Sequence, residues 1–108
     1  MRTDYVPLEG ALPAVETVLY TAPAGTRVRW RSLCVKNTDV VARNTFIYIR
    51  ASGAVSIRLL EFSLAPGYSV WFAEDELPVL VEGNTVRGMA AAANVVEYVM
   101  SFIEEHPV

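Results

Sequence analysis

One histidine and one cysteine are the first candidates for acid–base or nucleophilic chemistry in this chain. His106 stands in a polar terminal segment, so we expect no catalytic triad built on it. Cys34 is flanked by Leu33 and Val35, which is typical of a small buried hydrophobic side chain. A single cysteine also permits no intrachain disulfide. The sequence therefore predicts no catalytic residues.

Metal sites made from several histidines or cysteines are excluded by the same counts. The run Glu74-Asp75-Glu76 offers carboxylates, but adjacent acids lack the alternate-position spacing of a calcium-binding loop. We expect a solvated acidic loop there. The glycines stand singly in turns and form no P-loop or dinucleotide-binding motif. These patterns predict no metal, no cofactor and no enzymatic activity.

Three arginines alternate along one predicted strand: Arg27, Arg29 and Arg31. Because successive side chains of a strand point to opposite faces, these three project from one face at intervals of about 7 Å. Such a ladder can bind carboxylates of another protein. It can equally keep an outer strand soluble and prevent pairing between strand edges. The sequence leaves both interpretations open.

Trp71 is a second candidate contact residue. Its predicted strand places Tyr68, Val70 and Phe72 on one face and Trp71 on the other. An exposed tryptophan is typical of a binding hot spot, whereas a neighbouring loop could instead bury this ring. Both possibilities stay open at the level of sequence.

Short β-prone apolar runs that end in turn residues recur about every ten residues and define the expected elements. The predicted strands are 15–21, 26–35, 44–51, 56–62, 68–73, 79–81, 85–92 and 95–103. With no helix-length amphipathic pattern, these eight strands predict an all-β fold. We expect a small antiparallel β-sandwich of the jelly-roll or Greek-key type.

The second predicted strand changes parity along its length. Val28 and Trp30 point to one face, whereas Leu33 and Val35 fall on the other in a regular strand. A β-bulge near Arg31-Ser32 would return all four side chains to one face.

The predicted organisation is an extended N-terminal arm (1–14), a β-sandwich domain (15–104) and a short tail (105–108). The arm carries Tyr5, Val6 and Leu8 between turn-type breakers. We expect these three side chains to lie along a neighbouring molecule and to become ordered on binding.

The composition predicts a protein that adheres to other proteins. Hydrophobic residues make up 53% of the 108 residues, and the mean hydropathy is +0.31. A domain this small cannot bury that much apolar surface within itself. The net charge of −3 disfavours nucleic acid, and no apolar run is long enough to span a bilayer. Eight of the nine basic residues are arginine, which suits either protein interfaces or a GC-rich genome.

The order of several motifs carries a family resemblance. These motifs are Thr21 to Thr26 (TAPAGT), Cys34 to Thr38 (CVKNT), Leu64 to Ser69 (LAPGYS), Leu80 to Gly88 (LVEGNTVRG) and Val95 to Glu104 (VVEYVMSFIE). Together they resemble small virion proteins of tailed bacteriophages. The resemblance implies a cement, or decoration, protein without catalytic residues. It further implies a homodimer or homotrimer that binds the major capsid protein on the virion surface, after synthesis in the host cytoplasm. Many members carry Asp at the position of Asn84.

Two alternatives remain. One is a phage tail or head-to-tail adaptor component. The other is a small carbohydrate-binding β-sandwich module, in which Trp30, Trp71 and Tyr68 would form a stacking platform. The opposite parity of Trp71 and Tyr68 disfavours that platform.

Overall fold

The structure is a computed structural model that describes residues 1–107, in which nine β-strands and one short 3₁₀-helix are formed. The elements are β1 (Arg2–Ala11), β2 (Thr17–Thr21), β3 (Arg27–Asn37), β4 (Arg43–Arg50), β5 (Ile57–Leu64), β6 (Ser69–Ala73), η1 (Glu74–Glu76), β7 (Val79–Val81), β8 (Thr85–Ala90) and β9 (Val96–His106). No helix among these residues has the length and apolar character needed to cross a membrane.

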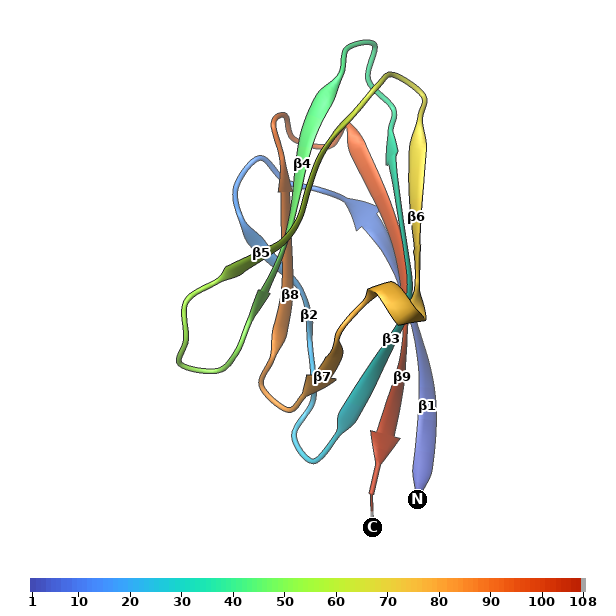
Figure 1. The fold of residues 1–108 in the computed structure, drawn as a ribbon, viewed down its shortest axis with the longest axis vertical. Helices are drawn as coiled ribbons and strands as arrows, with labels where there is room; N and C mark the ends of the chain where they lie inside the picture. The colour runs from blue at the N-terminus through green and yellow to red at the C-terminus, as the bar shows by residue number, and fades with distance from the viewer. Residues whose placement is uncertain (108) are drawn as a thin grey trace.

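Two antiparallel sheets face each other (Figure 1). The five-stranded sheet has the order β1-β9-β3-β6, and β7 also pairs with β3. The four-stranded sheet has the order β2-β8-β4-β5. This interleaving of early and late strands in both sheets is the arrangement of a jelly roll. The predicted all-β sandwich is therefore confirmed.

The core lies between the sheets. Four β3 side chains have no exposed surface: Val28, Trp30, Leu33 and Val35. They reach one face because the pairing of β3 with β9 shifts register between Trp30 and Ser32. The predicted β-bulge is confirmed, and it turns the second half of β3 toward the core.

An aromatic stack connects the two sheets. The rings of Tyr20 in β2 and Phe102 in β9 are stacked, with centroids 3.9 Å apart and an interplanar angle of 10°. The Trp30 ring lies 5.7 Å from Phe102 on the same sheet. The Tyr20 hydroxyl donates a hydrogen bond of 2.6 Å to Glu104. The stack thus holds the Tyr20 hydroxyl against Glu104, near the C-terminal end of β9.

The N-terminal segment differs from the predicted free arm. It forms β1, which pairs with β9 along its whole length. Pro7 and Gly10 hide this strand in the sequence, yet an edge strand with one neighbour tolerates both residue types. Leu12 follows β1 and has no exposed surface. The sandwich therefore includes most of residues 1–14, and β9 extends through His106 into the predicted tail.

The alanine run near residue 90 ends a strand. We expected a strand over 85–92, whereas β8 stops at Ala90. The chain then turns through Asn94, whose φ of 65° is left-handed. Asparagine adopts this conformation more readily than most residues, so the turn can form there without glycine.

Candidate interaction surface

The outer face of the five-stranded sheet gathers most of the predicted contact residues. Residues that pair across neighbouring strands form rows on this face. One row contains Glu9, Val99, Cys34 and Trp71. Two further rows are Tyr5, Ile103, Arg29 and Val79, and Thr3, Glu105, Arg27 and Val81. Residues at alternate positions, such as Val28 and Leu80, are buried in the core. The sheet therefore presents these rows away from the core.

Val99, Cys34 and Trp71 lie side by side on β9, β3 and β6, and we call them the apolar row. Trp71 is 70% exposed and Val99 is 50% exposed, so no loop of residues 1–107 covers them. Cys34 is half-buried on this outer face, and not in the core as expected. Burial raises the pKa of the Cys34 thiol, which keeps it protonated and weakly nucleophilic at neutral pH.

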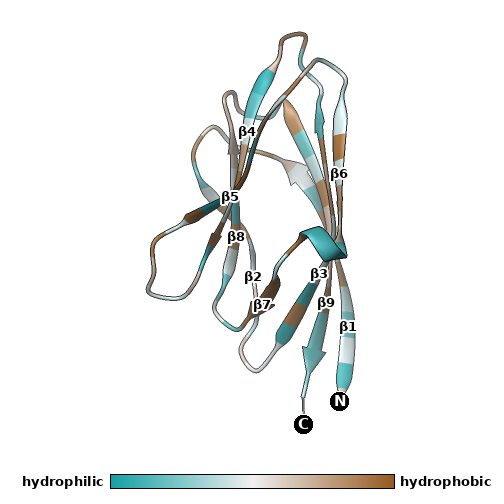
Figure 2. Ribbon diagram, viewed as in Figure 1, coloured by the Kyte–Doolittle hydropathy of each residue, from teal (hydrophilic) through white to brown (hydrophobic). Residues whose placement is uncertain are grey.

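The three arginines share the outer face and are paired within the chain. Arg27 lies 3.4 Å from Glu105, and Arg31 lies 3.6 Å from Glu74. Arg29 contacts both acids, Glu74 at 3.4 Å and Glu105 at 3.8 Å. This group of ion pairs therefore contains three positive and two negative side chains. Figure 2 shows hydrophilic residues on η1 and near the terminal ends of β1 and β9.

These ion pairs bear on both interpretations of the arginines. The arginine side chains are 37–60% exposed and Glu74 is 45% exposed, so the pairs with Glu74 contribute little to folding stability; Glu105 is 18% exposed. Their pairing with Glu74 and Glu105 also means that another protein's carboxylates would have to compete for them. The apolar row is consequently the stronger candidate contact.

The N-terminal candidates divide between the two faces of β1. Tyr5 is 62% exposed on the outer face. Val6 and Leu8 point inward and pack against the hydrophobic core. Among the three predicted contact residues, Tyr5 alone is free to meet a partner while β1 stays in the sheet.

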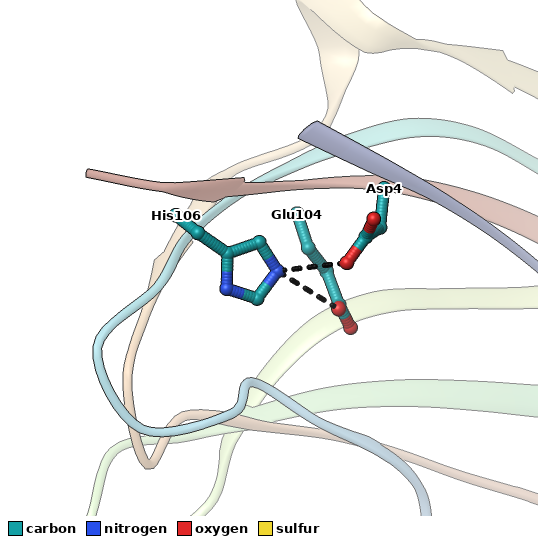
Figure 3. A group of neighbouring side chains, drawn as sticks. All are labelled: Asp4, Glu104 and His106. Carbon is teal, nitrogen blue, oxygen red and sulfur yellow. Dashed lines mark ion pairs between the residues drawn. The ribbon is translucent and has the colours of Figure 1, made fainter. Parts of the chain in front are cut away.

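A cluster that the sequence analysis missed lies where β1 begins and β9 ends (Figure 3). It consists of Asp4, Glu104 and His106, whose ligand atoms lie within 4.8 Å of one another. Carboxylate oxygens and an imidazole nitrogen are ligand types for divalent transition metals. The spacing of Glu104 and His106, two residues apart on one strand, indicates a shared face. The position of Asp4 beside them depends on the β1–β9 pairing, which the sequence analysis did not predict.

Within residues 1–107, no serine, threonine or cysteine side chain forms a hydrogen bond with His106. The hydrogen bonds and ion pairs of His106 within residues 1–107 involve Arg2, Asp4 and Glu104. Open concavities lie along β1 and β9, lined by groups such as Glu9, Gly10 and Val99. This arrangement suits ion pairing or ligation better than acyl or glycosyl transfer.

The sequence matches no protein-family model and no curated protein. Solved structures share its fold. One is a chain of Bacillus endospore appendages, which form disulfide-linked pili. It aligns with a TM-score of 0.62 and 18% identity over 98% of this chain and 88% of that chain.

A second similar structure is a chain of the T13 viral particle of infectious bursal disease virus. Its TM-score is 0.55 at 12% identity, over 98% of this chain and 32% of that chain. The present chain thus spans about a third of the viral chain. A capsid chain of Helicobacter pylori bacteriophage KHP30 is more distant, with a TM-score of 0.46 and 12% identity over 94% of this chain and 86% of that chain. At these identities the shared property is the fold.

Proposed function

We propose that this chain is a virion structural protein, specifically a capsid cement or decoration protein that binds the major capsid protein. The observation that carries the proposal is the apolar row, exposed on the outer face of a jelly-roll sheet. The fold likeness to a viral-particle chain and the order of the sequence motifs support the same assignment. In this role the chain bridges neighbouring capsid subunits, and its binding free energy must be overcome before they separate.

The apolar row is suited to binding because its strands are already fixed. β9 and β3 are each paired on both sides, so Val99 and Cys34 lose little conformational freedom when a partner covers them. Trp71 adds a large apolar ring beside them. A buried tryptophan at the centre of an interface contributes typically 2 kcal/mol or more, which is about 30-fold in affinity.

We place self-association on the opposite sheet, at the edge strand β5. Ile57 and Leu59 are exposed there, and the Arg58 guanidinium is drawn over the ring of Phe46 at 4.8 Å. Arg58 also forms an ion pair of 2.7 Å with Glu61 in the same strand, so the charges of β5 are paired with each other beside the exposed Ile57 and Leu59. Assigning β5 to self-association leaves the apolar row free for the capsid in a dimer.

The experiment uses capsids of the encoding virus assembled without this protein. Purified chain is added, and occupancy is measured by sedimentation with the particles and by electron microscopy. We expect wild-type chain to bind, and Trp71→Ser to weaken binding by about 30-fold. Val55→Ser is the matched control, because Val55 is 79% exposed outside the outer face. Equal binding of the wild type and Trp71→Ser would contradict the proposal.

The same experiment addresses the tail or adaptor alternative, for which the chain would bind isolated tails or connectors and leave capsids bare. The carbohydrate-binding alternative loses one member of its platform, because Trp30 has no exposed surface. A glycan-binding screen tests what remains of it, Trp71 and Tyr68.

A role like that of the disulfide-linked pili has less support. A subunit linked to neighbours on both sides needs two cysteines, whereas these 108 residues contain one, Cys34. A single thiol can join two copies but cannot extend a chain of them.

A further inference from the structure

We infer that Asp4, Glu104 and His106 form a binding site for one zinc-like divalent cation. The backbone pairing creates the cluster: Asp4 of β1 lies directly opposite Glu104 of β9, and His106 follows two residues later on the same face. His106 Nε2 lies 3.0 Å from Asp4 Oδ2 and 3.8 Å from Glu104 Oε1 (Figure 3).

These separations suit a tetrahedral cation. Zinc binds histidine nitrogen and carboxylate oxygen at about 2.0–2.2 Å, and a tetrahedron of that size has edges of about 3.4 Å. The two separations that involve His106 Nε2, 3.0 and 3.8 Å, bracket this value, and the two carboxylate oxygens lie within 4.8 Å of each other. Three protein ligands leave the fourth position for water. The imidazole ligand favours zinc and related ions over calcium and magnesium, which prefer oxygen.

Glu104 is already oriented for this task. Its side chain is 12% exposed, and its Oε2 accepts the 2.6 Å hydrogen bond from Tyr20. The remaining oxygen, Oε1, faces His106. Tyr20 belongs to β2 of the opposite sheet, and the stacking of its ring on Phe102 holds the hydroxyl in position. Second-shell hydrogen bonds of this kind orient the ligands of a metal site.

Arg2 is the nearest cationic side chain of the described residues. Its Nε lies 3.3 Å from Asp4 Oδ2, and its terminal nitrogen lies 3.3 Å from His106 Nε2. The Arg2 side chain is 70% exposed, so it can move into solvent when a divalent cation replaces its contacts with Asp4 and His106. The bound cation would fasten β1 to β9 and, through Tyr20, to β2.

The test is calorimetric titration of tag-free, chelator-treated full chain with zinc chloride. We expect one zinc per chain, with affinity at least about tenfold weaker in Asp4→Asn and in His106→Gln. Tyr20→Phe keeps the ring but removes the hydroxyl, and we expect a loss of about tenfold. Glu105→Gln is the matched control, since Glu105 pairs with Arg27 on the outer face and should bind zinc as the wild type does.

His106 is the sole histidine, so its imidazole NMR signals in the wild-type chain report this site without any variant. Zinc should shift these signals in the wild-type chain, and magnesium should not. Unchanged His106 signals, or equal zinc affinity in folded Asp4→Asn and wild type, would overturn the inference. The cluster would then be a set of polar contacts among Asp4, Glu104 and His106 without a metal.

Discussion

Asn37 shows how one buried side chain can organise several loops. It has no exposed surface, and its amide nitrogen donates hydrogen bonds of 2.8 Å to the carbonyl oxygens of Val41 and Leu64. Its Oδ1 accepts a 2.9 Å bond from the Asp39 N–H, which forms an Asx-type turn. The residue therefore connects the end of β3 to β5 and to the loop before β4.

Replacing Asn37 with Asp should destabilise the fold by about 1–3 kcal/mol. The substitution removes both amide donors and leaves the carbonyls of Val41 and Leu64 facing a buried acid. Urea unfolding followed by circular dichroism measures the change. Asn84→Asp is the control, because Asn84 is only half-buried and takes part through its backbone. Similar losses in both variants would show that the side-chain bonds of Asn37 are not responsible.

Thr45 presents the opposite case. It is fully buried on β4, and its hydroxyl has no hydrogen-bond partner among the described residues. Thr45→Val keeps the shape and removes the unsatisfied group, so we expect stability to rise by about 1 kcal/mol. The urea midpoint reports this gain. A decrease would indicate that the hydroxyl is bonded in solution, for example to water.

Asp39 should make stability depend on pH. Hydrogen bonds from the Val40 backbone and then from Arg43, both at 2.7 Å, lower the pKa of Asp39. The ionised form therefore stabilises the fold above the unfolded pKa of about 3.9, and this contribution is lost as the pH falls through the lower folded pKa. Asp39→Asn should lose stability at neutral pH and show a smaller further decrease below about pH 4. Urea unfolding across pH, with Asp75→Asn as control, measures this; parallel curves for Asp39→Asn and wild type would contradict it.

At the scale of elements, β1 is the edge of the five-stranded sheet and part of the core at the same time. Its inner side chains, Val6 and Leu8, pack against buried residues. Leu12 continues this contact: its backbone N–H donates to Val96 at 2.8 Å. Its side chain also meets the face of Gly88, where a Cβ atom would lie 2.9 Å from Leu12 Cδ2. β1 therefore helps to hold the sheets together.

Leu12→Ala should consequently destabilise the fold by about 2–5 kcal/mol. Tyr5→Ser, on the outer face of the same strand, should change stability little, because Tyr5 is 62% exposed. Urea unfolding of both variants measures the contrast. Comparable stability of Leu12→Ala and wild type would show that the segment after β1 is loosely held in solution.

At the scale of the whole molecule, the chain measures 49 × 26 × 20 Å and exposes large hydrophobic side chains on both of its sheets. This exposure agrees with the expectation from composition that a domain of this size leaves apolar surface uncovered. The two sides differ in detail. One presents the apolar row beside paired charges, and the other has the exposed edge strand β5.

We therefore expect concentration-dependent self-association that depends on β5. Ile57→Lys should shift the chain toward monomer in sedimentation equilibrium, because a lysine at this exposed apolar position of an edge strand opposes pairing between copies. Trp71→Ser should self-associate as the wild type does while losing capsid binding. A wild-type chain that stays monomeric at high concentration would contradict self-association. Loss of self-association in Trp71→Ser would move that contact to the apolar row.

The sequence by itself determined features that depend on near neighbours in the chain. Side-chain alternation located eight strands, and the parity change at Trp30 predicted the bulge in β3. The outward position of Trp71 and the shared face of the three arginines follow from the same alternation. Alternation is a local property of extended backbone, so it can be seen without knowing what each strand pairs with.

Only the tertiary structure decided how distant segments meet. Pro7 and Gly10 concealed β1, and its pairing with β9 joins residues about a hundred positions apart. That pairing placed Val6 in the core and Asp4 beside His106. The arginines likewise found Glu74 and Glu105 through chain folding. Contacts of this kind depend on the balance of loop entropy against burial over the entire chain, which no local pattern records.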